Sequence, residues 1–312
     1  MTKTIYCMHA VYDRSNVGSG AGHAVVDLKS YLVDVRARCP RVVDTEIKPD
    51  GKEAIRIQRF EERGGRVFVQ LVRYVTGDRM PTVLSMPVDS EDVGGYERAP
   101  KGKEYRDGDC YLLVSGKNVV FCPNGICLDS VEYYLSCIIG DIVGCIGRIK
   151  LIPVAKVDKV ALIVNHGVRS ISLRASAHSL SVEQKIREGR KYSIVDEILS
   201  LFRRDDSVSD MDFKSRDIMI GLEVSSRGNH RASQSSKNVL GALGRGLVES
   251  GFGGESNITI TTGNNERIST SEISLQKLVK IKVKDKSLDY ESVFREMSGY
   301  MDDLESSGVL DG

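Results

Sequence analysis

Apolar and polar residues along the first half of the chain form short runs that are separated by Gly, Pro and Asp turns. The β-branched and alternating runs predict strands at residues 3–12, 42–48, 53–60, 66–74, 110–114 and 118–122. The turn Pro49-Asp50-Gly51 predicts that 42–48 and 53–60 form a hairpin. Helical spacing of apolar residues predicts helices at about 24–35 and 128–139. This half is therefore expected to be an antiparallel sheet with helices packed on one face.

The second half of the chain shows the same pattern of short apolar runs separated by turn residues. Apolar runs predict strands at residues 148–154, 159–165, 169–174, 217–224, 257–262 and 277–283. The turn Gly263-Asn264-Asn265 is expected to join the last two as a hairpin. A helix is predicted near 192–202, and a terminal helix carries the apolar stripe Tyr290, Val293, Phe294, Met297, Met301 and Leu304. The sequence thus indicates an α+β protein of two domains, residues 1–146 and 147–312, whose terminal helix packs on its own domain or on a partner subunit.

Composition places the protein among ordinary globular chains. Its 312 residues are 41% apolar and 28% charged, enough for two separate cores. No run of about 18 apolar residues could span a membrane, and the first residues lead directly into a strand, so a cytoplasmic protein is expected. The seven cysteines lack the C-x-x-C spacing of a zinc or redox site, which predicts buried reduced thiols and no metal.

Charge is distributed unevenly although the net charge is only +1. Residues 1–146 carry 19 Lys and Arg against 20 Asp and Glu, whereas residues 147–290 carry 24 against 17, a net charge of +7. Residues 291–312 carry 1 against 6, a net charge of −5. The second half is therefore basic once its acidic tail is set aside, which favours a polyanionic partner.

Two segments concentrate this positive charge. Residues 225–237 follow a predicted strand and mix cations with Ser, Asn and Gln, a composition that suits phosphate oxygens; the alternative is a solvated loop. Lysines at alternate positions of 280–286, with Lys277, give a predicted hairpin a basic edge; the alternative is protection of that edge from pairing. The candidate DNA-binding residues are Lys214, Arg216, Arg227, Arg231, Lys237, Arg245, Lys280 and Lys282.

Catalytic motifs are few. The sequence contains no G-x-S-x-G, no Walker lysine loop and no H-E-x-x-H. Glycines at 18, 20 and 22 do not match the dinucleotide fingerprint and favour a flexible loop. Glu46-Ile47-Lys48 resembles the carboxylate-x-lysine pattern of Mg²⁺-dependent nucleases, but that chemistry also needs a second carboxylate. No cofactor, no catalytic residue and no small-molecule substrate are therefore predicted.

The order of segments resembles a known family. The hairpin at 110–121 with its following helix, the runs 148–153, 167–174 and 215–220, and the terminal helix resemble the RexA-like prophage exclusion proteins. The likeness is one of pattern over most of the chain. It implies a homodimeric, non-enzymatic, sequence-independent DNA-binding protein with RdgC-like architecture, which excludes superinfecting phage beside a possible membrane partner. The family's basic segment corresponds to Arg227, Arg231 and Lys237, and then to Lys214 and Arg216, although this sequence has more serines there.

Three functions are therefore weighed. The first is sequence-independent binding of double-stranded DNA by a homodimer in antiphage defence. The second is a Mg²⁺-dependent nuclease effector, and the third is a protein-only sensor or assembly module of a defence system.

Overall fold

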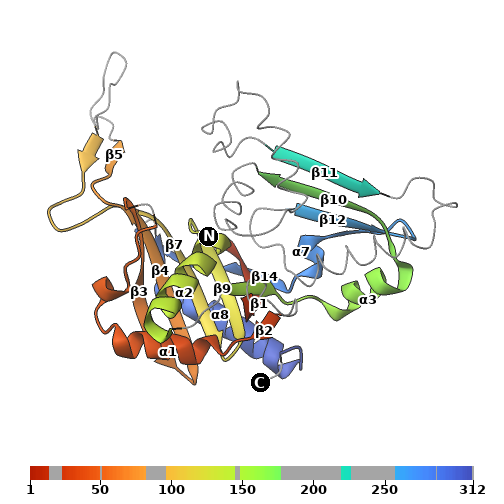
Figure 1. Ribbon diagram of the computed structural model, residues 1–312, viewed down its shortest axis with the longest axis horizontal. Helices are drawn as coiled ribbons and strands as arrows, with labels where there is room; N and C mark the ends of the chain where they lie inside the picture. Colours follow the sequence, from red (N-terminus) through yellow and green to blue (C-terminus); the bar gives the residue numbers. More distant parts are fainter. Residues whose placement is uncertain are drawn as a thin grey trace, which may run out of the picture. The chain divides into compact units, whose positions relative to one another are not determined.

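The computed structural model describes residues 1–13, 23–49, 51–81, 96–144, 148–176, 219–225, 257–285 and 287–310 (Figure 1). The chain divides into two compact units. Unit 1 comprises Met1–Ile5, Val25–Ile149 and Lys277–Gly312, and unit 2 comprises Tyr6–Ala24 and Lys150–Gln276. Antiparallel pairing dominates and helices accompany the strands, so the predicted α+β class is confirmed. Residues 277–312 belong to unit 1, whereas the sequence pattern placed them with the second half.

The larger sheet has the strand order β14-β1-β8-β7-β4-β3, and β2 and β9 also pair with β1. Its strands are β1 (Thr2–Asp13), β2 (His23–Val25), β3 (Glu53–Arg63), β4 (Arg66–Val75), β7 (Arg106–Ser115), β8 (Asn118–Asn124), β9 (Arg148–Pro153) and β14 (Gln276–Lys280). Positive φ angles at Gly64, Gly65 and Gly116 make the tight turns between β3 and β4 and between β7 and β8. The strands predicted at 53–60, 66–74, 110–114 and 118–122 are therefore confirmed, and β3 and β14 stand at the two ends of the order.

Helices cover both faces of this sheet, whereas the sequence predicted only one covered face. Val67–Val72 of β4 is buried without interruption, which requires packing on both sides because successive strand residues point to opposite faces. α1 (Leu28–Arg38) and α2 (Leu128–Val143) lie on one face and α8 (Tyr290–Ser306) on the other (Figure 1). The second covered face was missed because the sequence pattern does not specify that α8 returns to unit 1.

The terminal helix α8 packs on its own unit. The Phe68 ring of β4 is fully buried and meets the rings of Tyr290 and Phe294 edge to face, each at a centroid distance of 5.0 Å. Val293, Met297, Met301 and Leu304 of the predicted stripe are also buried. The sequence left open the predicted domain 147–312 or a partner subunit, but the structure packs the stripe on strands of the first half of the chain, so the stripe no longer supports a partner subunit.

Unit 2 contains a four-stranded antiparallel sheet with the order β11-β10-β12-β13. The strands are β10 (Val168–Ser176), β11 (Met219–Ser225), β12 (Asn257–Thr262) and β13 (Arg267–Ser269), accompanied by α3 (Val157–His166) and the short α7 (Thr270–Ile273). Its described core consists of isoleucines and valines from these elements, centred on Ile171, Ile258 and Ile260. Predicted strands at 169–174, 217–224 and 257–262 are confirmed.

Three predicted elements are wrong. Val42–Thr45 forms a 3₁₀ turn, η1, because Asp44 bonds back to Arg41; only Ile47 pairs with β3, through Ile55. Residues 159–165 lie in helix α3, since a short apolar run fits a strand or a buried helix equally well. Finally, the turn at 263–265 joins β12 to β13, and residues 276–280 form β14 of the larger sheet instead. The helix predicted near 192–202 lies outside the described residues.

Two small hairpins complete unit 1. β5 (Arg79–Pro81) pairs with β6 (Tyr96–Arg98) in the connection between β4 and β7, and we call this pair with residues 99–105 the arm. β15 (Val283–Lys284) pairs with β16 (Ser287–Leu288) directly after β14. In the part of the chain that the structure describes, no helix has the length and apolar character needed to cross a membrane.

Six cysteines lie among the described residues, and all six are free thiols. Cys7, Cys110 and Cys122 are buried, Cys39 and Cys137 are half-buried, and Cys127 is exposed. Burial raises the pKa of Cys7 to about 12. Burial is also the largest of the causes that raise the pKa of Cys122 to about 12. Both thiols therefore stay protonated at neutral pH. The expectation of buried thiols therefore holds for Cys7, Cys110 and Cys122, and fails for Cys127.

The packing of Phe68 generates the first prediction. Phe68→Ala should lower the free energy of unfolding by about 3–5 kcal/mol, because it removes a fully buried ring and both edge-to-face interactions with α8. Urea unfolding followed by circular dichroism measures this loss. Tyr96→Ala is the control: that ring is 67% exposed on the arm, so its loss should change stability by no more than about 0.5 kcal/mol. Equal losses in both variants would contradict the packing described for α8.

Candidate nucleic-acid interface

Most cations next to the sheet core of unit 1 are neutralised by an acidic neighbour. Arg66 lies 2.7 Å from Asp302 and 2.6 Å from Glu305, and Arg73 lies 2.7 Å from Asp107. These arginine side chains are only 16% and 15% exposed. Their charge is therefore neutralised by acidic partners within the fold, and it contributes little to the electrostatic potential at the surface.

The acidic residues of the tail are used in the same way. Asp302 and Glu305 of α8 bind Arg66, Asp303 binds Lys277 at 2.7 Å, and Glu291 binds Arg63 at 3.1 Å. Four of the acids that give residues 291–312 a net charge of −5 are thus paired with nearby arginines and a lysine. Acidic residues of the tail that are engaged by these partners are less able to mask lysines elsewhere on the unit.

The lysine edge consists of Lys280, Lys282 and Lys284, on and just after strand β14. All three side chains are exposed; Val279 and Ile281, on either side of Lys280, are 4% and 2% exposed, whereas Val283, between Lys282 and Lys284, is 48% exposed. Within the described ranges, none of the three lysines forms an ion pair. Alternation with Val279 and Ile281 therefore anchors the backbone around Lys280 and Lys282 and turns these two ammonium groups to solvent. The predicted Lys280 and Lys282 lie here, and Lys286 lies outside the described residues.

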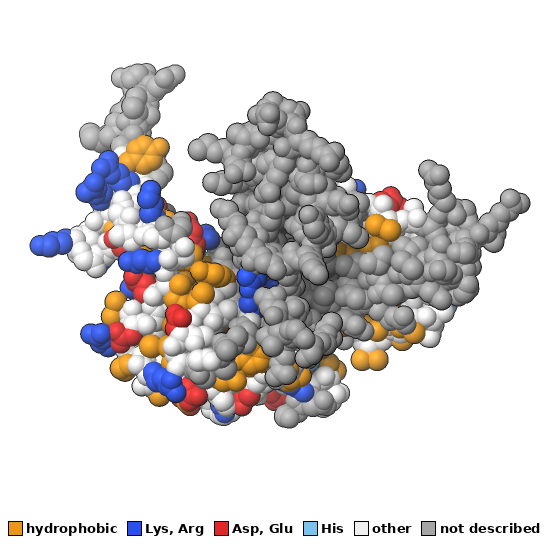
Figure 2. All heavy atoms as spheres, in the orientation of Figure 1, with side chains coloured by type: hydrophobic (Ala, Val, Ile, Leu, Met, Phe, Trp, Pro, Cys, Tyr) orange, Lys and Arg blue, Asp and Glu red, His pale blue; other side chains and the backbone are white. Residues whose placement is uncertain are grey.

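The arm carries a second group of exposed cations that the sequence pattern did not single out. Arg79 of β5 lies directly opposite Arg98 of β6, and Lys101 and Lys103 follow in the same connection. Like charges opposite each other on two strands repel and are unfavourable unless an anion lies between them. Among the described residues no ion pair compensates any of these four cations. Figure 2 shows Lys and Arg side chains gathered around this arm.

A hydrogen bond at the base of the arm connects it to the lysine edge. The Arg106 guanidinium donates to Ser287 Oγ, and Ser287 is the cross-strand partner of Lys284. Arg106 also donates to the carboxylate of Asp109 at 3.3 Å. The arm and the lysine edge are therefore neighbours within unit 1, and together we call them the basic surface.

Asp109 holds the base of the basic surface in place. It is 1% exposed and accepts hydrogen bonds from Tyr111 at 2.8 Å, from Gln70 at 3.1 Å and from Asn124. A buried carboxylate with this many donors has its hydrogen-bonding capacity satisfied. Because Asp109 is held by these bonds and accepts from Arg106, it fixes the position of Arg106. Arg106 in turn orients the start of β7 and the arm that precedes it.

The basic surface also contains acidic residues, which limits its charge. Its segments 76–81, 96–107 and 278–285 with 287–288 hold eight cations, Arg79, Arg98, Lys101, Lys103, Arg106, Lys280, Lys282 and Lys284. They hold five acids, Asp78, Glu97, Glu104, Asp107 and Asp285, and Asp107 is already paired with Arg73. The local net charge is +3 by this count of 8 − 5. A surface of this charge is suited to binding a few phosphates rather than to forming a deep channel.

The other predicted DNA-binding residues, Lys214, Arg216, Arg227, Arg231, Lys237 and Arg245, lie outside the described residues. For the arm, the sequence does carry a signal, a cluster of cations beside an aromatic residue at Tyr96, Arg98, Lys101 and Lys103. The apolar pattern does not reveal this segment, because three-residue strands such as β5 and β6 give no measurable periodicity.

Glu46, the carboxylate of the nuclease-like pattern, is surrounded by donors. It accepts a hydrogen bond from Tyr74 and lies 3.1 Å from Lys48 Nζ and 3.7 Å from the Arg56 guanidinium. Burial would raise its pKa, but the bond from Tyr74 and the two cations outweigh burial and lower the pKa. Two adjoining positive charges oppose a divalent cation at this carboxylate. In the described ranges, no three His, Cys, Asp or Glu side chains converge as a metal-binding group.

Comparisons of the chain with protein-family models, curated proteins and solved structures gave no match. Function is therefore inferred from the residues and from the geometry of the basic surface.

The Glu46 cluster generates the second prediction. Glu46→Gln should lower the free energy of unfolding at pH 7 by about 1–3 kcal/mol, because Lys48 and Arg56 lose a carboxylate that is only 15% exposed. The folded pKa of Glu46 is lowered, so its contribution is complete above the usual value of 4.5 and is lost as pH falls through the lower folded value. Urea unfolding from about pH 7 to about pH 3 should show the two proteins converging in acid.

The control is Glu62→Gln, since Glu62 is an exposed residue of the adjacent strand β3 and forms no ion pair within the described ranges. Its stability difference should stay near zero at every pH. A Glu46→Gln difference that is constant with pH would show that the charge of Glu46 does not matter.

Proposed function

We propose that the protein binds double-stranded DNA through its phosphates, without sequence preference. The observation that carries the proposal is the separation of cations in unit 1. Those beside the core are ion-paired, whereas Arg79, Arg98, Lys101 and Lys103 of the arm and the three lysines of the edge are exposed without an ion pair among the described residues. Exposed, uncompensated cations release counterions when they meet a polyanion, which is the main source of non-specific affinity for DNA.

The type of residue supports sequence-independent binding. A lysine ammonium is a compact point charge on a flexible stem, which binds phosphate but does not select a base edge. The cations of the basic surface come from short strands and their connections, β5, β6, β14 and β15. Sequence readout in the major groove is usually made by a helix or by side chains that form paired hydrogen bonds with bases. The basic surface is therefore suited to positioning DNA and not to reading it.

The biological setting is part of the proposal. The resemblance to RexA-like proteins supports a role in phage exclusion in the cytoplasm, as a homodimer and beside a possible membrane partner protein. Arg227, Arg231 and Lys237 form a second proposed phosphate-binding group. A protein-only sensor module is the alternative, and the DNA-binding experiment separates the two functions.

The third prediction tests the basic surface. The double variant Lys280→Ala/Lys282→Ala should weaken binding of random and defined duplexes equally, and should reduce the slope of log K against log salt by about 0.9 for each phosphate that is no longer neutralised. Adding Arg79→Ala and Arg98→Ala should reduce the slope further. Fluorescence anisotropy of a labelled duplex at several salt concentrations measures both effects.

The matched control is Arg41→Ala/Arg295→Ala. Both arginines are exposed, at 76% and 63%, but each has an acidic partner, so the net charge falls by the same two units while the basic surface stays intact. Affinity and slope should then be nearly those of the unmodified protein. Equal losses in the two double variants would mean that the overall charge of the protein, and not the basic surface, determines DNA affinity. No loss in either, with a loss in Arg227→Ala/Arg231→Ala/Lys237→Ala, would move the interface to residues 225–237.

The fourth prediction concerns assembly. Light scattering at micromolar concentration should give the mass of two chains, as the resemblance implies. Because the apolar stripe of α8 is buried in unit 1, the predicted dimer must use another surface. A mass of one chain at every accessible concentration would remove the dimer from the proposal and leave DNA binding to be judged on its own.

A further inference from the structure

One serine hydroxyl stands between the arm and the lysine edge. Arg106, at the start of β7, donates from Nη2 to Ser287 Oγ of β16. Ser287 is paired across the small hairpin with Lys284 of β15. Residues directly opposite each other in an antiparallel pair project on the same face, with Cβ atoms about 5 Å apart. The hydrogen bond to Ser287 therefore brings Arg106 to the face of the hairpin that carries Lys284.

This hydrogen bond leaves donors available on that face. A serine hydroxyl has one hydrogen and two acceptor lone pairs, and Ser287 Oγ uses a lone pair to accept from Arg106. Its own hydrogen must then point away from the guanidinium. Among the described residues this hydrogen has no acceptor, and neither has the Nε–H of Arg106. Ser287 is half-buried and Arg106 is exposed, so both donors can reach a bound group.

The guanidinium of Arg106 is held in place from its other side. Its Nη1 lies 3.3 Å from the carboxylate of Asp109, which is buried and also accepts hydrogen bonds from Tyr111 and Gln70. Asp109 and Ser287 thus fix the two terminal nitrogens of one side chain. A group that is already ordered loses less conformational entropy when it binds an anion, which favours affinity.

The acids around this face limit its net charge. Asp109 lies beneath Arg106, and Asp289 accepts a hydrogen bond from the backbone of Ser292 at 2.9 Å as the N-cap of α8. Asp285 lies in the turn between β15 and β16, is exposed, and forms no ion pair within the described ranges. These carboxylates offset much of the local positive charge. Affinity for an anion here must therefore depend on the placement of the donors and not on charge alone.

We propose that Arg106, Ser287 and Lys284 form a binding site for a single phosphate group. The Ser287 hydroxyl donates to one phosphate oxygen and the Nε–H of Arg106 to a second. The Lys284 ammonium, on its flexible stem, approaches the same group as a point charge. This inference rests on the proposed function, since DNA is the expected source of the phosphate. It adds to that function a site at which placed hydrogen bonds, besides counterion release, hold one phosphate.

The fifth prediction removes the hydroxyl without changing the charge of the protein. Ser287→Ala should weaken binding of duplex DNA by about fivefold or more, because one phosphate oxygen loses its donor. The slope of log K against log salt should stay the same, since no cation is removed. Fluorescence anisotropy of a labelled duplex at several salt concentrations measures both quantities.

Two further serine variants separate the hydroxyl from the packing of the hairpin. Ser287→Thr keeps the hydroxyl and should restore the affinity that is lost in Ser287→Ala. The matched control is Ser306→Ala, which removes an exposed hydroxyl of α8 and should leave the affinity unchanged. Equal weakening in Ser287→Ala and Ser287→Thr would contradict a donor role for the hydroxyl.

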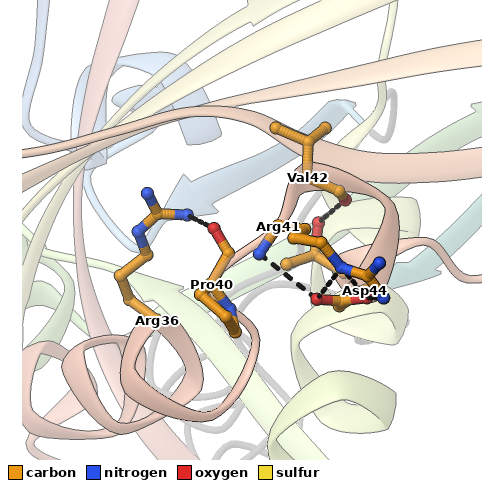
Figure 3. Close-up of polar contacts among 6 residues, drawn as sticks. Arg36, Pro40, Arg41, Val42 and Asp44 are labelled. Carbon is orange, nitrogen blue, oxygen red and sulfur yellow. Dashed lines mark hydrogen bonds and ion pairs between the residues drawn. The ribbon is translucent and has the colours of Figure 1, made fainter.

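The guanidinium is tested in the same way. Arg106→Lys keeps the charge but loses the planar fork, so it should weaken duplex binding by about fivefold at an unchanged salt slope. The matched control is Arg41→Lys. Figure 3 shows Arg41 closed onto Asp44, and its Nε and Nη2 both donate to that carboxylate. Because the fork of Arg41 is occupied, Arg41→Lys should not change the affinity.

Two duplexes of one sequence distinguish the sources of the phosphate, one with 5′-phosphate ends and one with 5′-hydroxyl ends. Tighter binding of the phosphorylated duplex, with the gain lost in Ser287→Ala, would assign the site to a terminal phosphate. Equal binding of the two duplexes, with equal weakening in Ser287→Ala, would assign it to an internal phosphodiester. Both results support the phosphate site.

Failure of this site and failure of the proposed function are distinguishable. If the unmodified protein binds duplex DNA, and Ser287→Ala and Arg106→Lys bind it equally well and are folded by circular dichroism, the site is wrong and DNA binding stands.

If the unmodified protein binds no duplex DNA even at about 20 mM salt, the proposed function fails. The site is then judged with inorganic pyrophosphate by isothermal titration calorimetry on the full chain. A dissociation constant of about 1 mM or below, raised about fivefold in Ser287→Ala, would support the site. No heat of binding at about 10 mM pyrophosphate would overturn it.

Discussion

The packing of α8 on Phe68 is the interaction on which the rest of unit 1 depends. A sheet whose central strands are apolar on both faces needs two covers, and α1 with α2 supplies only one of them. The second cover comes from the last helix of the chain, joined through the rings of Tyr290 and Phe294. For α8 to reach this face, the preceding residues must return to the same unit, and they do so as strand β14. The position of the lysine edge is thus a consequence of how the core is closed.

The same packing decides which cations remain available. α8 brings acids against Arg63, Arg66 and Lys277, so these three cations are neutralised within the fold. The next lysines along the chain, Lys280 and Lys282, lie beyond the reach of that acidic face and stay uncompensated among the described residues. Surface ion pairs contribute little to stability individually. Their larger effect here is on the distribution of charge, because they separate structural cations from exposed ones.

The sequence predicts the fold well where the apolar pattern is long and its turns are marked by glycine. The hairpins around Gly64-Gly65 and Gly116 and the helix from Leu128 are examples. It fails where a local side-chain bond overrides the pattern, as at Asp44, and where a short run such as 159–165 fits two structures. Of the candidate site, Lys280 and Lys282 could be predicted from their alternation with Val279 and Ile281. The link from Arg106 to Ser287 could not, because it joins residues 181 positions apart.

The lysine edge stands at one end of the larger sheet. β14 and β3 terminate the strand order, and four strands separate them, which places them roughly 24 Å apart at about 4.8 Å for each of five spacings. At the β14 end, Lys280 is exposed while its neighbours Val279 and Ile281 stay in the core, so the strand carries a cation without loss of packing. The central strands cannot offer this, since β4 and β7 are buried on both faces. The arm, by contrast, extends from the connection between the central strands β4 and β7. The exposed cations of the basic surface thus stand at an edge strand and beyond the ends of the central strands, outside a core that is closed on both faces.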